Sequence, residues 1–178
     1  VVVGGGPAGA TAACDLARRG TKVLLLERGF RIKPCGGAIP PRAVEDFQIP
    51  AEQIVARIKS ARMIAPSDER VDMPVGDTYV AMVDRDRFDP FLRERAAEAG
   101  ATVVTGAFQS LEYLDDGRVR LRYLDKSGAG GTPQVIARAV IGADGAKSRV
   151  GAQCVPGADK LKCVLAYHEI VEAPANDD

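Results

Sequence analysis

The sequence predicts an α/β protein in which a Rossmann-like βαβ unit is followed by a mainly antiparallel β portion. Two observations predict this class. Near the start, a continuous apolar run leads into a glycine cluster and a helix-length segment, which is typical of a parallel sheet covered on both faces. Further along, short apolar segments are separated by Asp-Gly and glycine-rich turns, which is typical of antiparallel strands.

The opening βαβ unit is predicted from the apolar runs that flank a helix-length segment. Strands are expected at residues 1–3 and 23–26, with a helix between them at residues 7–19. Gly20 should end this helix, because glycine readily adopts the left-handed conformation at a helix C-terminus. A long loop rich in Pro and Gly is expected at residues 28–42.

The rest of the chain is predicted to contain short strands and two more helices. The helices are expected at residues 42–47 and 89–101. Asp89 and Pro90 form a good cap and first-turn pair for the second helix, with an earlier start left open. The glycine-rich segment 127–133 is better explained as a hairpin loop than as a second nucleotide site. Strands are expected at residues 60–66, 70–75, 78–84, 101–106, 108–117, 118–125 and 133–144.

A glycine pattern lies between the first expected strand and helix. Gly4, Gly6 and Gly9 form G-x-G-x-x-G, in which the glycines permit a tight turn, approach of a pyrophosphate and close helix packing. Glu27 ends the second strand 23 residues after Gly4, where a carboxylate accepts hydrogen bonds from an adenosine ribose and repels a 2′-phosphate. The pattern therefore predicts a dinucleotide site for NAD or FAD rather than for NADP.

A second turn of interest follows a later apolar strand. The strand ends at Asp144 and Gly145, and Ser148 and Arg149 follow where a helix is expected to start. Such a turn can supply a second contact to the same extended dinucleotide, and it can equally be a plain turn with a helix cap. The residues alone leave both interpretations open.

Composition argues against several other classes of function. Lys plus Arg and Asp plus Glu number 24 each, so the net charge does not indicate a nucleic-acid partner. The four cysteines form no Cys-x-x-Cys pair and His168 is the single histidine, so no metal site is expected. No apolar run approaches the roughly 20 residues of a membrane span. We expect a cytoplasmic protein in a reducing compartment, with peripheral attachment to a membrane left open.

The chain is expected to be a fragment that is truncated at both ends. A strand that feeds a glycine turn normally has residues before its first apolar one, and here Val1 is already apolar. At the other end, an apolar segment at residues 163–173 has no evident partner strand downstream. Function is therefore considered for a longer parent protein.

Several segments, taken in order, resemble the FAD-dependent oxidoreductases of the p-hydroxybenzoate hydroxylase-like fold: VVVGGGPAGATAA, LLLERG, VDRDRFDPFLRERAAEAGA and VIGADGAKSRV. Within that group, RIKPCGGAIPPRAVEDFQIP and LAYHEIVEAP are similar to geranylgeranyl reductases, most closely the chlorophyll and bacteriochlorophyll type. The resemblance implies an enzyme that uses FAD, with NADPH as reductant, to saturate double bonds of a geranylgeranyl group. The substrate is implied to be a geranylgeranylated pigment or geranylgeranyl diphosphate, which becomes the phytyl form in (bacterio)chlorophyll biosynthesis, with peripheral association to a photosynthetic membrane.

The resemblance assigns roles to individual residues. It implies that the three glycines of the first turn hold the FAD pyrophosphate and that Glu27 and Arg28 address the adenosine end. Arg85 is implied to contact the flavin, while Asp144 and Gly145 match a motif associated with the FAD pyrophosphate and the pyridine nucleotide. Relatives carry a later Gly-Asp motif that this chain does not contain, and Gly151 replaces an arginine often found shortly after the Asp-Gly motif.

The Cys-Gly-Gly loop is implied to face the isoalloxazine ring and the reacting alkene. Gly37 would let the loop lie close to a flat ring. Cys35 would then either help to position or protonate the substrate or pack beside the flavin, and both interpretations stay open. Tyr167 and His168 are further candidates for the proton donor.

The resemblance also divides the chain into expected domains. Residues 1–60 should form the FAD-binding βαβ unit with the Cys-Gly-Gly loop, and residues 61–84 should be strands of the substrate domain. Residues 85–150 should return to the FAD-binding domain with its Asp-Gly motif, and residues 151–178 should begin an incomplete substrate domain. The alternative functions are an FAD-dependent aromatic monooxygenase, an archaeal-type geranylgeranyl lipid reductase, a non-catalytic FAD-binding remnant and a plain NAD-binding module.

Overall fold

The computed structural model describes residues 1–29, 32–33 and 35–164, which form two units. The first unit comprises Val1–Arg31 and Asp89–Cys163, and the second comprises Ile32–Phe88 together with Val164–Asp178. The predicted α/β class is confirmed, because the chain opens with a parallel βαβ unit and most of its later strands pair antiparallel. Most of the apolar segment expected to form a strand near the end lies outside the described residues.

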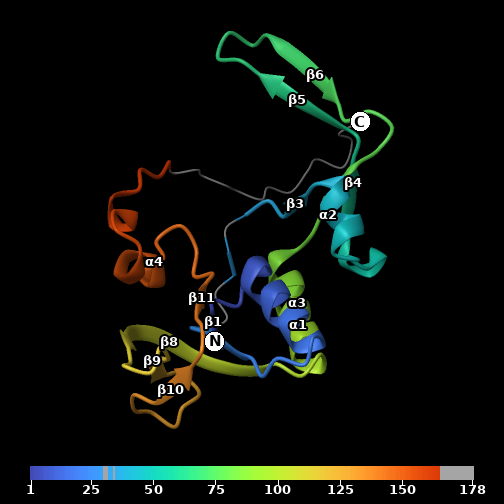
Figure 1. Ribbon diagram of the computed structural model, residues 1–178. Coiled ribbons are helices and arrows are strands. Elements are labelled where there is room, and N and C mark those ends of the chain that lie inside the picture. The colour runs from blue at the N-terminus through green and yellow to red at the C-terminus, as the bar shows by residue number, and fades with distance from the viewer. Residues whose placement is uncertain (30–31, 34, 165–178) are drawn as a thin grey trace. The chain divides into compact units, whose positions relative to one another are not determined.

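A six-stranded sheet forms the centre of the first unit (Figure 1). β11, β1, β2 and the first residues of β8 run parallel, whereas the rest of β8 pairs antiparallel with β9, which pairs antiparallel with β10. The carboxyl ends of the parallel strands therefore lie at one edge, where ligands bind in open α/β sheets. In spatial order the strands are β10 (Gln134–Ala137), β9 (Val119–Asp125), β8 (Thr102–Tyr113), β2 (Leu24–Glu27), β1 (Val2–Val3) and β11 (Ile141–Gly142).

Two long helices lie side by side against this sheet (Figure 1). They are α1 (Pro7–Arg18) and α3 (Arg85–Glu98), and the Cys14 Sγ of α1 is 3.7 Å from the carbonyl oxygen of Arg95 in α3. Cys14 is buried, as expected for a thiol that packs in a core. Gly20 ends the first helix as predicted, with a φ of +77° and its N–H donating to the Ala17 carbonyl oxygen at 2.8 Å.

The core of the first unit joins the parallel sheet to the antiparallel strands. Its buried side chains come from β1, β2, β8, β9 and the short helix α4 (Arg149–Cys154), which is followed by a 3₁₀ turn at Ala158–Lys160. Burial of these apolar groups holds both parts of the sheet in one unit. The residues are Val3, Leu26, Phe108, Leu121 and Val150.

The predicted start of the helix near Asp89 is wrong. The helix begins one turn earlier, because the Arg87 and Phe88 N–H groups already donate to the Asp84 carbonyl oxygen at 3.1 and 2.8 Å. Pro90 therefore lies inside the helix, where it has no N–H to donate. The segment before it contains good helix formers and an acidic residue in the first turn, which favours a start at this earlier position.

The strands expected at residues 101–106 and 108–117 are a single strand, β8. Its first four residues pair with β2, its remainder pairs with β9, and the register shifts between Phe108 and Ser110. The irregularity lets one strand turn from a parallel to an antiparallel neighbour without a break in the chain. Conversely, the segment expected as one strand at residues 133–144 contains two, β10 and β11.

The glycine-rich segment between β9 and β10 is a hairpin loop, as predicted. The Asp125 carboxylate organises it by accepting from the Ser127 Oγ at 2.8 Å, the Ser127 N–H at 3.2 Å and the Gly130 N–H at 2.8 Å. These hydrogen bonds, the Ser127 side chain first among them, hold the pKa of Asp125 below its usual value. The Asp125 carboxylate therefore occupies the hydrogen-bond donors that an anionic ligand such as a nucleotide would need in this loop.

The second unit contains a three-stranded antiparallel sheet and a separate hairpin. In the sheet, β7 (Val80–Met82) lies between β3 (Ala38–Ile39) and β4 (Ala56–Ile58). Helix α2 (Pro41–Asp46) and a 3₁₀ turn at Ala51–Gln53 connect the outer strands. Ala81 in β7 is fully buried, which places the centre of this small sheet at its middle strand.

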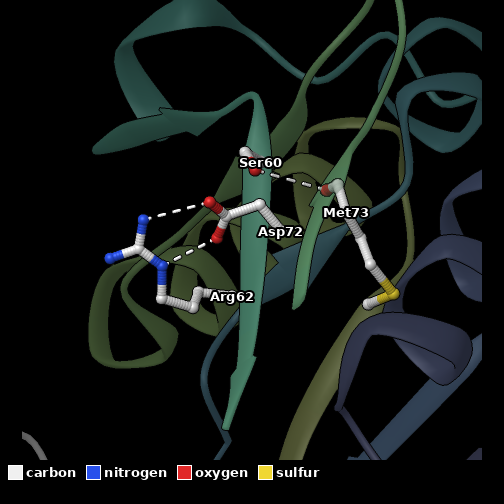
Figure 2. A network of polar contacts seen from close by, with 4 residues as sticks. All are labelled: Ser60, Arg62, Asp72 and Met73. Carbon is white, nitrogen blue, oxygen red and sulfur yellow. Dashed lines mark hydrogen bonds and ion pairs between the residues drawn. The ribbon is translucent and has the colours of Figure 1, made fainter. Parts of the chain in front are cut away.

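The hairpin of β5 (Ser60–Ile64) and β6 (Arg70–Pro74) has one polar and one apolar face. On the polar face, Arg62 Nε and Nη2 donate to the two Asp72 carboxylate oxygens at 2.7 and 3.1 Å (Figure 2). This hydrogen-bonded pair lowers the pKa of Asp72. The pairing register places Ala61, Met63, Val71 and Met73 on the opposite face, and Figure 2 shows the Met73 side chain pointing away from the ion pair.

Candidate functional site

The first element of the candidate site is the turn between β1 and α1. Gly4 adopts a φ of +103°, and a Cβ built on it would lie 2.3 Å from the Ala143 carbonyl oxygen. A Cβ on Gly9 would lie 1.8 Å from the Gly4 carbonyl oxygen. Both glycines are therefore required by close backbone contacts, the first between β1 and β11 and the second between the turn and α1.

Gly6 differs from these two glycines because nothing surrounds the place of its missing side chain. It is the N-cap of α1, with a φ of −74° and a ψ of −177°, and a Cβ at this position would meet no atom within 4 Å. Pro7 follows as the first helical residue, and the first turn contains no acidic residue. The backbone N–H groups at this helix start, with open space in front of Gly6, fit an anionic group such as a pyrophosphate.

Glu27 lies at the end of β2, as predicted, and its carboxylate contacts the glycine turn. The Gly5 N–H donates to Glu27 Oε2 at 2.6 Å, and the Gly29 N–H donates to Glu27 Oε1 at 3.2 Å. Each carboxylate oxygen has a second lone pair, so both remain able to accept from a ribose hydroxyl. Arg28 follows the strand and is exposed.

Asp144 and Gly145 lie at the carboxyl end of β11, next to the turn. The Asp144 Cα would be 2.9 Å from a Cβ on Gly4, so the structure brings together two motifs that are 140 residues apart in the chain. Gly145 has a φ of +90°, which a non-glycine residue rarely adopts. The two sequence motifs therefore share one edge of the sheet.

The Asp144 carboxylate also caps the start of α4. It accepts from the Ser148 hydroxyl, from the Arg149 N–H at 2.7 Å and from the Val150 N–H at 3.3 Å. Ser148 is the N-cap and accepts from the Gly151 N–H at 2.7 Å. The helix-cap interpretation of this turn is thus seen directly, and the proposed cofactor contact stays a prediction.

The Cys-Gly-Gly loop and Arg85 belong to the second unit. Gly37 has a φ of +69°, its carbonyl oxygen accepts from the Val83 N–H at 3.0 Å, and a Cβ on it would lie 1.9 Å from the Val83 carbonyl oxygen. The loop is therefore held against the end of β7 by a contact that only glycine permits. Cys35 is an exposed free cysteine, and Arg85 is the half-buried first residue of α3.

Sequence reasoning missed two residues of the turn's surroundings, Gly5 and Arg93. Gly5 occupies a variable position of the glycine pattern, and Arg93 lies 88 residues further along. Arg93 and Asp89 are buried charged residues one helical turn apart, with exposed fractions of 9% and 7%. The sequence signal that could have found Arg93 is the presence of two opposite charges within the apolar stripe of the expected helix. Such charges are expected to be buried and therefore to need polar partners.

The described part of the chain shows neither a metal-binding cluster nor a membrane-spanning helix. Between residues 1 and 164, omitting the gaps at 30–31 and 34, no three His, Cys, Asp or Glu side chains are grouped to hold a metal ion. None of the helices in that same portion is both long and apolar enough to cross a membrane. Tyr167 and His168, the other candidate proton donors, lie outside the described residues.

Comparisons with known proteins identify the family to which this chain is similar. Residues 1–161 match the family model for an FAD binding domain. A geranylgeranyl diphosphate reductase of Rhodobacter capsulatus is 53% identical over 173 residues, which cover 97% of this chain and 43% of that protein. Digeranylgeranylglycerophospholipid reductase 2 of Methanopyrus kandleri is 39% identical over 100% of this chain and 46% of that protein.

A solved structure shares both fold and sequence with the chain. The geranylgeranyl bacteriochlorophyll reductase-like protein of Thermoplasma acidophilum superposes with a TM-score of 0.76 at 29% identity, covering 93% of this chain and 42% of that one. The chain therefore spans less than half the length of these three proteins.

Proposed function

The chain belongs to the FAD-binding domain family, and from this premise we propose that the whole protein is an NADPH-dependent flavin reductase that saturates double bonds of a geranylgeranyl group. The observation that carries the proposal is the similarity to a geranylgeranyl diphosphate reductase along nearly the whole chain. Geranylgeranylated pigment or geranylgeranyl diphosphate is the proposed substrate, within (bacterio)chlorophyll biosynthesis. Cytoplasmic location with peripheral attachment to a photosynthetic membrane is part of the same proposal.

The residues of the turn suit the proposed cofactor. The open space at Gly6 and the start of α1 suit the pyrophosphate, and Glu27 at the end of β2 suits the adenosine ribose. Bound FAD supplies a two-electron carrier between the nicotinamide and the alkene. For each double bond, one NADPH and one proton are consumed, and NADP⁺ and a carbon–carbon single bond with two added hydrogens result.

The remaining assignments are part of this proposal. Arg28 would lie toward the adenosine end, Arg85 toward the flavin, and Asp144 with Gly145 toward the pyrophosphate. Residues 61–84 and 151–178 would contribute to the substrate domain, and the rest of the chain to the FAD-binding domain. The hydride acceptor is an unactivated alkene, so a proton must reach the other carbon, and Cys35 is the described residue proposed to assist.

Incubation of the full-length protein with NADPH and geranylgeranylated chlorophyllide under anaerobic conditions is expected to give products heavier by successive pairs of hydrogens. Mass spectrometry of the extracted pigment measures this gain, and a sample without NADPH is the control. Unchanged pigment, with NADPH oxidation that requires oxygen, would contradict the proposal and favour an aromatic monooxygenase.

A second candidate is an archaeal-type reductase of geranylgeranyl lipids, favoured by the similarity to the Methanopyrus kandleri reductase. Both candidates perform the same reduction on different carriers of the isoprenoid chain. Parallel assays with digeranylgeranylglycerophospholipid and with the pigment distinguish them, because the preferred carrier should be reduced at a lower substrate concentration.

Replacement of Cys35 by serine in the full-length protein is expected to lower turnover by at least about tenfold while FAD binding stays normal, because proton delivery to the alkene would be impaired. Turnover under saturating NADPH and the flavin absorbance of the purified protein measure the two effects. The matched control is Cys163→Ser, which changes another exposed free cysteine. Normal turnover in Cys35→Ser would leave this cysteine as a packing residue only.

A further inference from the structure

The Gly5 peptide groups are held from two sides by charged side chains of opposite sign. Its N–H donates to Glu27 Oε2 at 2.6 Å, and its carbonyl oxygen accepts from Arg93 Nη1 at 3.0 Å. We propose that Arg93 is a positioning residue that fixes the glycine turn in the orientation that binds the FAD pyrophosphate. The inference rests on the FAD-binding part of the proposed function and not on the substrate.

Arg93 reaches the turn from a distant part of the chain and is buried there. Only 9% of it is exposed, and a guanidinium removed from water is costly unless it is hydrogen-bonded. The Gly5 carbonyl oxygen is one such partner. Since hydrogen bonds to charged groups are stronger than neutral ones, this contact restrains the turn more than an ordinary backbone bond would.

The absence of a side chain on Gly5 makes this contact possible. A Cβ at Gly5 would lie 2.9 Å from Arg93 Cδ, 2.9 Å from Glu27 Cβ and 3.0 Å from Glu27 Oε2. The aliphatic part of Arg93 and the carboxylate of Glu27 thus both occupy the space that a side chain would take. Glycine is therefore required at position 5 because these two side chains fill the space of a Cβ, and not because of its backbone conformation, since its φ is not positive.

The restraint on the Gly5 carbonyl determines where the next N–H points. The peptide between Gly5 and Gly6 is trans, as the described backbone contains no cis bond, so the Gly5 C=O and the Gly6 N–H point in opposite directions. With the carbonyl oxygen turned toward Arg93, the Gly6 N–H is directed away from the buried guanidinium. A flip of this peptide would instead present a carbonyl oxygen to the phosphates, which would repel them.

The proposal can be tested with Arg93→Gln and Arg93→Lys in the full-length protein. The FAD-free protein is titrated with FAD by fluorescence, and ADP and adenosine are then used as competitors. We expect Arg93→Gln to raise the dissociation constants of FAD and ADP by at least about tenfold, the effect of one lost charge-assisted hydrogen bond. The constant for adenosine, which lacks phosphate, should stay within about twofold. Arg93→Lys should give an intermediate loss, because lysine can donate to the carbonyl but with different geometry.

The matched control is Arg18→Gln, which removes an exposed arginine from the last turn of α1 and should change none of the three constants. An unchanged ADP constant in Arg93→Gln, or equal weakening of ADP and adenosine, would overturn the proposal, since a purely structural role does not distinguish phosphate. If Arg93→Gln does not fold, Arg93→Lys provides the same test. Weaker binding of ADP with unchanged binding of adenosine supports the proposal, and equal weakening of both overturns it. Wild-type protein that binds FAD but reduces no geranylgeranyl group refutes the proposed function and leaves this inference standing.

Discussion

Replacement of Gly9 by alanine is expected to lower the free energy of unfolding by about 3 kcal/mol or more, because the added methyl group cannot be accommodated. Its carbon would lie 1.8 Å from the Gly4 carbonyl oxygen, 3.0 Å from the Gly4 carbonyl carbon and 3.1 Å from the Ala143 Cβ. The first two of these atoms are backbone, so relief requires α1 to move away from the turn. Urea unfolding of the full-length protein, followed by circular dichroism, measures the change.

The matched control for this experiment is Gly6→Ala, which adds the same methyl group three residues earlier. A Cβ there meets no atom within 4 Å, and the backbone angles are ordinary for alanine. The free energy of unfolding of Gly6→Ala should therefore stay within about 1 kcal/mol of wild type, and the small loss reflects the poorer preference of alanine for the N-cap position. Equal stability of the two variants would show that α1 does not pack against the turn as described.

The Gly6→Ala variant is also expected to bind FAD at least about a hundredfold more weakly, although it folds normally. The second glycine of this pattern allows the backbone to approach a pyrophosphate closely, and a methyl group would extend into the open space in front of the turn. Titration of the FAD-free variant with FAD, beside thermal unfolding in the absence of FAD, measures both properties. An unchanged dissociation constant would mean that the pyrophosphate does not approach at Gly6.

The two alanine variants therefore separate two uses of glycine in one short pattern. The structure shows that Gly9 is needed for the packing of α1 against the turn, and Gly6 is proposed to be needed for binding of the pyrophosphate. Sequence analysis assigned both roles from the pattern alone, because they depend on local backbone geometry that the spacing already specifies. The βαβ unit and the position of Glu27 were predictable for the same reason.

The features that sequence analysis missed depend on contacts between distant residues or on competing local signals. The contact between Arg93 and Gly5 joins α3 to the turn across 88 residues. The position of Arg93 in the buried stripe of the helix indicates that it needs a partner, but the sequence does not identify that partner as Gly5. Asp89 and Pro90 form a good start signal for a helix, but Asp84 supplies the carbonyl that actually begins it. The helix therefore begins before the Asp89-Pro90 pair, because the residues that precede this pair also favour a helix.

The continuity of β8 has a consequence for folding cooperativity. Four of its residues hydrogen-bond to β2 beside the glycine turn, and the rest form the antiparallel ladder with β9. Local opening of the antiparallel strands therefore frays a strand that also supports the parallel sheet, so the two parts share one barrier to unfolding. A destabilising substitution in the part of the β8–β9 ladder distant from β2 is therefore expected to reduce the hydrogen-exchange protection of the amides around the end of β2 as well.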